Sequence, residues 1–175
     1  MKLHGKNIYV SALEKEHCRE LYRINEYDVD TETDSPLGYA ISSADEWFEE
    51  MQKSQHKSHL RLGVFKPNGE IIGDVAVQNI DWRNRHASLG LGIAKVSDRH
   101  RGYGYEAMQL IIHHAFNHLG LNRLMAETSS KNQPAQKLLI KLGFNHEGTL
   151  RKKIYADGIF YDGLVYGLLK EEYKK

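Results

Sequence analysis

The stretch Arg99-His100-Arg101-Gly102-Tyr103-Gly104-Tyr105-Glu106-Ala107 is more informative about the fold than any other part of this 175-residue chain. It follows a strand-like apolar run, 87–94, and precedes an amphipathic run, 107–119, typical of a helix. Glycines at a strand-to-helix junction leave backbone N–H groups pointing at one place, where the helix dipole adds positive charge. Because Gly102 and Gly104 lack a Cβ, a ligand can approach the backbone closely. The stretch predicts a phosphate-binding turn, although a short turn considered alone is more often an ordinary connection.

The segment 132–144 (Asn-Gln-Pro-Ala-Gln-Lys-Leu-Leu-Ile-Lys-Leu-Gly-Phe) has the pattern of a capped helix. Asn132 suits the N-cap, Pro134 is tolerated in the first turn, and Gly143 suits the position after the last turn. An apolar stripe at helical spacing consists of Ala135, Leu138, Leu139 and Leu142. By itself, the segment is typical of a well-capped surface helix.

In combination, the two segments resemble the GNAT family of acyl-CoA-dependent N-acetyltransferases. The family's pattern Arg/Gln-x-x-Gly-x-Gly/Ala is matched by Arg99, Gly102 and Gly104. Its second pattern, Asn-x-x-Ala/Ser followed by Leu and Lys-Leu-Gly-Phe, is matched by Asn132, Ala135, Leu138 and 141–144. The resemblance covers nearly the whole chain. Its C-terminal run, 148–172, is similar to the closing hairpin of the branch that contains ribosomal-protein and spermidine acetyltransferases.

The rest of the chain predicts alternating strands and helices. We expect strands at 8–12, 60–64, 71–78, 87–94 and 124–128, helices at 13–25, 43–55 and 107–119 and after Asn132, and two final strands joined at Asp157-Gly158. The helix at 43–55 opens with a capping-box pattern, 43–46. The resemblance implies an α/β (α+β) fold over 1–175. We expect a single GNAT-like domain with a mixed, mostly antiparallel central sheet flanked by about four helices.

Composition indicates the class of protein. The chain is near the usual size of one domain, and it has neither an apolar stretch that could span a bilayer nor the apolar segment of a secretory signal. We therefore expect a cytoplasmic location and no membrane or nucleic-acid partner, since no Lys/Arg patch with interleaved aromatics is present. Cys18 is the only cysteine and suits a packed position. The ten histidines lack metal-ligand spacing, so we expect no metal.

The resemblance implies that acetyl-CoA binds along the two signature segments as co-substrate. Its pyrophosphate would contact the cationic turn, and the backbone of 91–93 would pair with the pantetheine amides like an added strand. Asn132 would lie near the pantetheine and Lys137 near the adenosine end. For Lys137 and Lys141 alone, solubilising surface charge is at least as good an explanation. The expected cofactor-binding residues are Leu91, Gly92, Ile93, Arg99, His100, Arg101, Gly102, Tyr103, Gly104, Tyr105, Asn132, Ala135 and Lys137.

A net charge of +1 hides an uneven distribution. Between Ile24 and Gln52 there are nine acidic residues and no Lys, Arg or His, and removing their −9 from +1 leaves +10 elsewhere. Charge runs usually form a solvated face, which suits Glu49 and Glu50. The resemblance implies that the loop 26–34 lies beside the acceptor groove. Its expected substrate-binding residues are Glu26, Asp28, Asp30 and Glu32.

An acidic groove attracts a cationic amine and repels phosphorylated or carboxylated acceptors. Because each exposed ion pair contributes only ~0–1 kcal/mol, several carboxylates must act together. We therefore expect a polyamine, a basic peptide or a protein N-terminus as acceptor, and not a sugar nucleotide.

The chemistry departs from the family pattern. Amide formation needs a neutral amine, so a proton must leave the acceptor directly or through water. Where many relatives have a Glu base this chain has Ser88, and where many have a Tyr acid it has Leu139. Where other relatives have a Ser, the chain has Ala135. None of these three side chains can perform well the role that the Glu, Tyr or Ser at the same position has in those relatives.

The replacement candidates are Glu127, Ser88 and His86. Glu127 is the first candidate for a water-mediated base, with a structural role at a strand edge nearly as well supported. Ser88 could orient a water. His86 has a suitable unperturbed pKa, although a surface histidine is the simpler interpretation. Tyr155 or Tyr161 would reach the sulfur only if the closing hairpin folds over the site. Positioning and N–H polarisation of the thioester can supply roughly 7–11 kcal/mol in the best cases.

Two functions remain open at this point. The first is an active acetyltransferase that moves an acetyl group from acetyl-CoA to a cationic primary amine by direct attack in a ternary complex. The second is an acyl-CoA-binding sensor or interaction module that kept the donor site and lost the chemistry. The intact signatures and the acidic block favour the first. An exposed C-terminal strand could also pair two copies of the chain as a homodimer.

Overall fold

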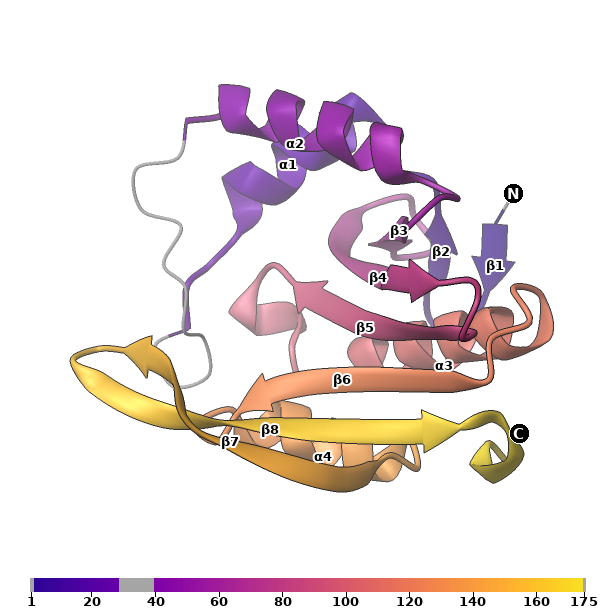
Figure 1. Ribbon diagram of the computed structural model, residues 1–175. Coiled ribbons are helices and arrows are strands. Elements are labelled where there is room, and N and C mark those ends of the chain that lie inside the picture. Colours follow the sequence, from indigo (N-terminus) through magenta and orange to yellow (C-terminus); the bar gives the residue numbers. More distant parts are fainter. Residues whose placement is uncertain (1, 29–39, 175) are drawn as a thin grey trace.

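A computed structural model of the protein describes residues 2–28 and 40–174. Within these ranges the chain forms an eight-stranded sheet and four α-helices (Figure 1), none of them long and apolar enough to cross a membrane. The strands are β1 (Lys2–His4), β2 (Tyr9–Ser11), β3 (Leu60–Phe65), β4 (Ile71–Asp81), β5 (His86–Ile93), β6 (Arg123–Ser129), β7 (Asn145–Ala156) and β8 (Ile159–Leu169). The helices are α1 (Lys15–Ile24), α2 (Ser42–Ser54), α3 (Tyr103–Asn117) and α4 (Gln133–Lys141), with 3-10 turns η1 (Val96–Asp98) and η2 (Lys170–Glu172).

The sheet has the strand order β1-β2-β3-β4-β5-β6-β8-β7. Neighbouring strands run antiparallel except for β5 and β6, which are parallel and joined through α3. The predicted fold class, a mixed and mostly antiparallel sheet flanked by helices, is confirmed.

β5 and β6 are side by side over only part of their length. Their register extends from the pair His86–Arg123 to the pair Ser88–Met125. Beyond that point β5 stays bonded to β4 and β6 to β8, while the two ribbons diverge in Figure 1. Within the described residues, the edge of β5 that faces β6 therefore has no strand partner over 89–93, and its N–H and C=O groups there are available to a ligand.

The two faces of the sheet are covered by different helices. Ala87 and Leu89 of β5 pack with Ile111 of α3 in the larger hydrophobic core. The smaller core joins α1 and α2 to Phe65 and Ile71, at the β3–β4 hairpin. Figure 1 shows the α1–α2 pair grouped at one end of the sheet, with α3 and α4 behind it.

β5 has one apolar face and one nearly bare face. A Cβ built on Gly104 of α3 would lie 3.0 Å from the side chain of Leu91 and 3.9 Å from that of Ile93, so both side chains point toward α3. Side chains alternate along a strand. The residues on the opposite face of β5 are therefore Ser88, Gly90 and Gly92.

Most predicted elements are confirmed with boundaries shifted by a few residues. The capping box at 43–46 is wrong, because α2 begins at Ser42 after the N-cap Ile41 and no side chain caps it. Strand β1 was not predicted. The glycine-rich turn contributes more to α3 than expected, since this helix begins at Tyr103 and not at Ala107.

Candidate functional site

The turn between β5 and α3 has an unusual backbone. His100 has φ 59° and Gly102 has φ 85°, so two residues of the turn are in the left-handed region. A Cβ on Gly102 would meet nothing within 4 Å, and the backbone conformation is therefore what favours glycine here. The first α-helical hydrogen bond runs from the N–H of Glu106 to the carbonyl of Gly102 at 3.0 Å. The N–H groups of 103–105 precede that bond and converge at the start of α3. We call residues 99–105 the cradle.

A cavity of about 520 Å³ opens beside the cradle. It lies where β5 and β6 separate, between the end of β5, the start of α3 and α4. Its lining residues are Asn25, Asp28, Leu91, Gly92, Ile93, Asp98, Arg99, His100, Gly102, Gly104, Tyr105, Asn132, Pro134, Ala135, Lys137, Leu138 and Lys141. Every residue that we predicted to bind the donor lines this cavity, apart from Arg101 and Tyr103.

The wall formed by α4 is held in place at both ends. Asn132 Oδ1 accepts a hydrogen bond from the Ala135 N–H at 3.1 Å, as expected for an N-cap. The Gln136 amide donates to the carbonyls of Ser129 and Ser130, which ties α4 to the end of β6. Lys141 Nζ lies 4.4 Å from the centroid of the Tyr105 ring, which joins α4 to the cradle. The walls on both sides of the cavity are thus fixed to each other.

Arg99 is bound to the protein on several sides. Its Nε donates to the Ile93 carbonyl at 3.0 Å, its Nη2 donates to the Glu26 carbonyl at 3.0 Å, and its Nη1 pairs with Asp28 at 3.3 Å. The guanidinium therefore joins the end of β5 to the segment that follows α1. Arg101 instead donates through Nε to the Ser97 carbonyl at 2.7 Å, outside the cavity lining.

The fit of an anionic donor rests on the cradle and on the cations around it. The free N–H groups at the start of α3 are suited to phosphate oxygens, and His100, Lys137 and Lys141 line the same cavity. The unpaired edge of β5 at 89–93 is suited to the amides of an extended pantetheine arm. Coenzyme A, which carries both groups, therefore fits the residues present.

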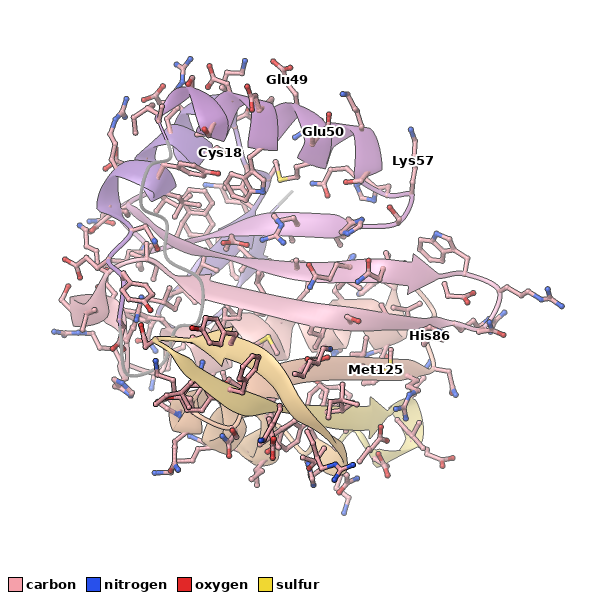
Figure 2. The ribbon with its side chains drawn as sticks, turned by 60° about the vertical axis from the view of Figure 1, so that its left-hand side comes forward. Cys18, Glu49, Glu50, Lys57, His86 and Met125 are labelled. Atoms are coloured by element: carbon pink, nitrogen blue, oxygen red, sulfur yellow. The ribbon has the colours of Figure 1, made fainter. Side chains whose placement is uncertain are left out.

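The predicted acceptor-binding acids are only partly within the described residues. Glu26 accepts a hydrogen bond from the Val96 N–H at 2.7 Å, and Asp28 pairs with Arg99 and lines the cavity. Asp30 and Glu32 lie outside the described residues. Glu49 and Glu50 project outward from α2 in Figure 2, as expected of a solvated face.

None of the predicted catalytic residues lines the cavity. Glu127, on β6, forms an ion pair of 2.6 Å with Lys153 of β7. His86 begins β5, at the end of the strand remote from the cradle (Figure 2), with its Nε2 3.6 Å from an oxygen of Asp81. Ser88 lies on the sheet face opposite α3. The structure thus separates these side chains from the cavity lining.

Two acids, the buried Asp98 and the partly buried Asp74, were missed by the sequence reasoning. Asp98 lines the cavity and pairs through Oδ1 with Lys66 Nζ at 2.9 Å, while its buried Oδ2 has no partner among the described residues. Asp74 lies on β4 and is hydrogen-bonded to Arg61 of β3. The available signal for Asp74 was a lone carboxylate within the apolar run 71–77. Burial raises the pKa of Asp74, and the nearby Arg61 opposes this effect.

Comparison with known sequences identifies the family. The chain matches the model of the acetyltransferase (GNAT) domain over residues 7–145. It is 32% identical over 117 residues to an uncharacterized N-acetyltransferase, YoaA, of Bacillus subtilis, a match that covers 66% of this chain and 66% of YoaA. The chain thus spans slightly less than two thirds of the length of that relative.

Solved structures show the same fold. Spermidine N-acetyltransferase from Vibrio cholerae, in complex with CoA and spermine, aligns with a TM-score of 0.83 and 22% identity over 97% of this chain and 99% of its own. RimJ of Mycobacterium smegmatis, in complex with CoA-disulfide, aligns with a TM-score of 0.85 and 21% identity over 96% of this chain and 84% of its own. Together with the domain match and the two signature segments that meet in one cavity, this shows that the chain belongs to the GNAT family of acetyltransferase domains.

Proposed function

We propose that the protein is an N-acetyltransferase that moves an acetyl group from acetyl-CoA to a primary amine by direct attack in a ternary complex. The observation that carries this proposal is a single cavity that combines the free edge of β5, the N–H groups at the start of α3 and one side of α4. Such a cavity suits a ligand with an extended amide-containing arm and a pyrophosphate.

On the donor side, acetyl-CoA supplies the acetyl thioester, and the protein binds and orients it. The cradle N–H groups and His100 would hold the pyrophosphate, and the backbone of 91–93 would hold the arm. Lys137, on the outer part of the cavity wall, would face the adenosine end. Arg99 would act mainly by fixing the shape of the turn, since its donors are already bound to protein oxygens.

On the acceptor side, we propose a cationic amine: a polyamine, a basic peptide or a protein N-terminus. The support is the acidic composition of the loop 26–34, which includes Asp28 on the cavity wall and the predicted contacts Glu26, Asp30 and Glu32. The similar Vibrio cholerae structure is of a spermidine acetyltransferase bound to spermine, which agrees with this class. Clusters of like charge attract an oppositely charged ligand over several ångströms.

For the proton transfer, Glu127, Ser88 and His86 stay candidates that would have to act through water. Lys153 competes for the Glu127 carboxylate, and His86 is distant along β5 from the cavity. Positioning of the amine against a thioester polarised by backbone N–H groups would supply much of the rate.

The remaining alternative is an acyl-CoA-binding sensor, which the absence of the family's usual Glu and Tyr favours. A thiol-release assay with acetyl-CoA separates the two functions. The panel of acceptor amines should include spermidine, a lysine-rich peptide and a phosphorylated amine such as glucosamine 6-phosphate. CoA binding should be measured in parallel by calorimetry. We expect thiol release with the cationic amines and not with the phosphorylated one. CoA binding without turnover across the panel would exclude the enzyme and establish the sensor.

We further propose one cytoplasmic domain over residues 1–175, without a metal. The support is the continuous sheet, to which both the first and the last strands of the chain belong. The last strand, β8, lies inside the sheet between β6 and β7, so a homodimer would form through the edge strand β7 and not through β8 as we expected.

A further inference from the structure

Polar side chains gather on the face of the sheet opposite α3. Arg61 of β3 donates to Asp74 and, at 3.2 Å, to Gln78 Oε1, both of β4. The ring of Trp47 from α2 lies 5.7 Å from the Arg61 guanidinium carbon. This polar row crosses β3 and β4 and points toward the bare face of β5.

The bare face of β5 leaves Asp74 uncovered on one side. In the β4–β5 register, Asp74 is opposite Gly92 and Gln78 is opposite Ser88. A Cβ on Gly92 would lie 3.2 Å from Asp74 Oδ1, and a Cβ on Gly90 would lie 3.4 Å from the Gln78 amide nitrogen. Any larger side chain at 92 would thus press against this carboxylate. Glycine keeps a space open between Asp74 and the strand.

Gly92 is shared by the two features. It lines the donor cavity, and it is paired with Asp74 in the β4–β5 register. Ser88, where relatives have their Glu base, is four residues further from the cradle, about 13 Å along the strand. Asp74 is therefore the carboxylate on this sheet face that is closest in register to the cavity end of β5.

One oxygen of Asp74 is available. Oδ2 accepts the hydrogen bond from Arg61, whereas Oδ1 accepts none from the residues that the structure describes. The side chain remains 17% exposed, so a small ligand can reach it. Besides Arg61, the titratable group that interacts electrostatically with Asp74 is the thiol of Cys18, on α1. Burial, and then the Asp74 charge, raise the pKa of Cys18 to about 11, so this thiol stays neutral near pH 7.

We propose that Asp74 binds the acceptor amine beside Gly92 and accepts its proton, in place of the glutamate that Ser88 replaces. This inference rests on the proposed acetyltransferase function and assigns its amine-binding carboxylate. Arg61 holds one carboxylate oxygen and so orients the other toward β5. Burial, which raises the pKa of Asp74, makes the carboxylate a better proton acceptor than an exposed aspartate.

The proton balance is as follows. The ammonium group of the acceptor gives one proton to the Asp74 carboxylate and becomes a neutral amine. The amine lone pair forms the new C–N bond to the thioester carbonyl carbon, and the C–S bond breaks. The second proton lost from nitrogen goes to the leaving thiolate, and Asp74 returns its own proton to water. No oxidant, reductant or metal is required.

The test compares D74N with D45N. Asp45 is a matched control, because it forms two hydrogen bonds of 2.8 Å with Arg19 in another Arg–Asp pair at the α1–α2 contact. We expect D74N to lower kcat/KM for spermidine by about 10²–10⁴-fold and to move the acidic limb of its pH profile toward the alkaline pKa of the free amine, which must then lose its proton without the carboxylate. CoA affinity by calorimetry should change less than about twofold. D45N should retain the wild-type profile.

D74N leaves the Arg61 charge without its carboxylate and can fail to fold. The double variant D74N/R61Q replaces the pair by neutral amides and should show the same loss of turnover. Melting curves establish which variants are folded. In the wild type, kcat/KM should fall on acidification as Asp74 becomes protonated.

Three results would overturn the assignment. They are a folded D74N or D74N/R61Q protein with wild-type kcat/KM, an acidic limb that stays at the wild-type pH in either variant, and a wild-type pH profile without an acidic limb. Each of these leaves the acetyltransferase proposal standing, because the wild type still turns over. A wild type that binds CoA but acetylates no amine of the panel would overturn both.

Discussion

Arg99 and Asp28 form an ion pair of 3.3 Å between the cradle and the segment that follows α1, 71 residues earlier in the chain. The same guanidinium also binds the carbonyls of Ile93 and Glu26. A residue that the sequence signature presents as a phosphate ligand thus connects the donor turn to the predicted acceptor loop. The proposed donor and acceptor sites would thus share one anchoring side chain.

This relationship predicts the outcome of R99K. Lysine keeps the charge but cannot form the forked hydrogen bonds of the guanidinium. We expect the loss of these bonds to loosen the turn and to weaken CoA binding about tenfold, measured by calorimetry. The exposed Arg23, paired with Glu16 and Glu20 on α1, supplies the control R23K, which should bind CoA normally. Unchanged CoA affinity in R99K would mean that the charge alone matters.

Gly102 offers a test of the cradle with a close structural match. Gly102 and Gly69 have φ of 85° and 90°, and a Cβ on either would meet nothing within 4 Å. Alanine at either position therefore costs a similar strain of roughly 1–2 kcal/mol. We expect G102A and G69A to lower the melting temperature by similar amounts, whereas only G102A should weaken CoA binding. Equal CoA affinity in the two variants would argue against the cradle.

His114 predicts a pH dependence of stability. Burial, and then the charges of His118, His56 and His113, lower the pKa of His114 from 6.5. The unfolded chain therefore binds a proton at His114 more readily than the folded chain does. Stability that is present above pH 6.5 should be lost as the pH falls through that value toward the lower folded pKa.

Melting temperature measured between pH 7.5 and pH 5 provides the check. H114Q should reduce the decrease on acidification, since its side chain does not titrate. The exposed His4 provides the control H4Q, which should melt with the wild-type pH dependence. If the melting temperature of H114Q decreased with acidification as steeply as that of the wild type, His114 would not be the source of the pH dependence.

The core of α3 supports the cradle through packing. Ile111 is fully buried, whereas Ile140 on α4 is 63% exposed. We expect I111A to destabilise the protein by about 2–5 kcal/mol and I140A by less than about 0.5 kcal/mol in urea unfolding. Comparable losses in the two variants would contradict the assignment of Ile111 to the core.

The donor side of the site could be predicted because its determinants are local. The backbone conformation of the cradle follows from glycine at 102, and the N-cap of α4 follows from Asn132. Both features depend on residues only a few positions apart, so a short sequence pattern is enough to predict them. The same locality explains why nearly every predicted donor contact lines the cavity.

Local patterns were insufficient where a partner is distant in the chain. Nothing near 127 in the sequence indicates that Lys153 occupies the carboxylate of Glu127, and nothing near Asp74 reveals Gly92 beside it. The capping box at 43–46 failed for a similar reason. A favourable local hydrogen-bond pattern did not set the start of α2, which begins after Ile41.

The sequence by itself determined the order of the strands and helices from β2 onward, the glycine turn, the capped α4 and hence the family. These features rest on alternation, helical spacing and backbone preference, which act over a few residues. Only the tertiary structure decided that Arg99 faces protein oxygens, that β5 and β6 separate after Ser88, and that Asp74 lies above Gly92. The physical reason is that strand register and burial bring together groups from distant positions in the chain. The free energy of each such contact depends on both partners, so it cannot be inferred from the sequence around either one.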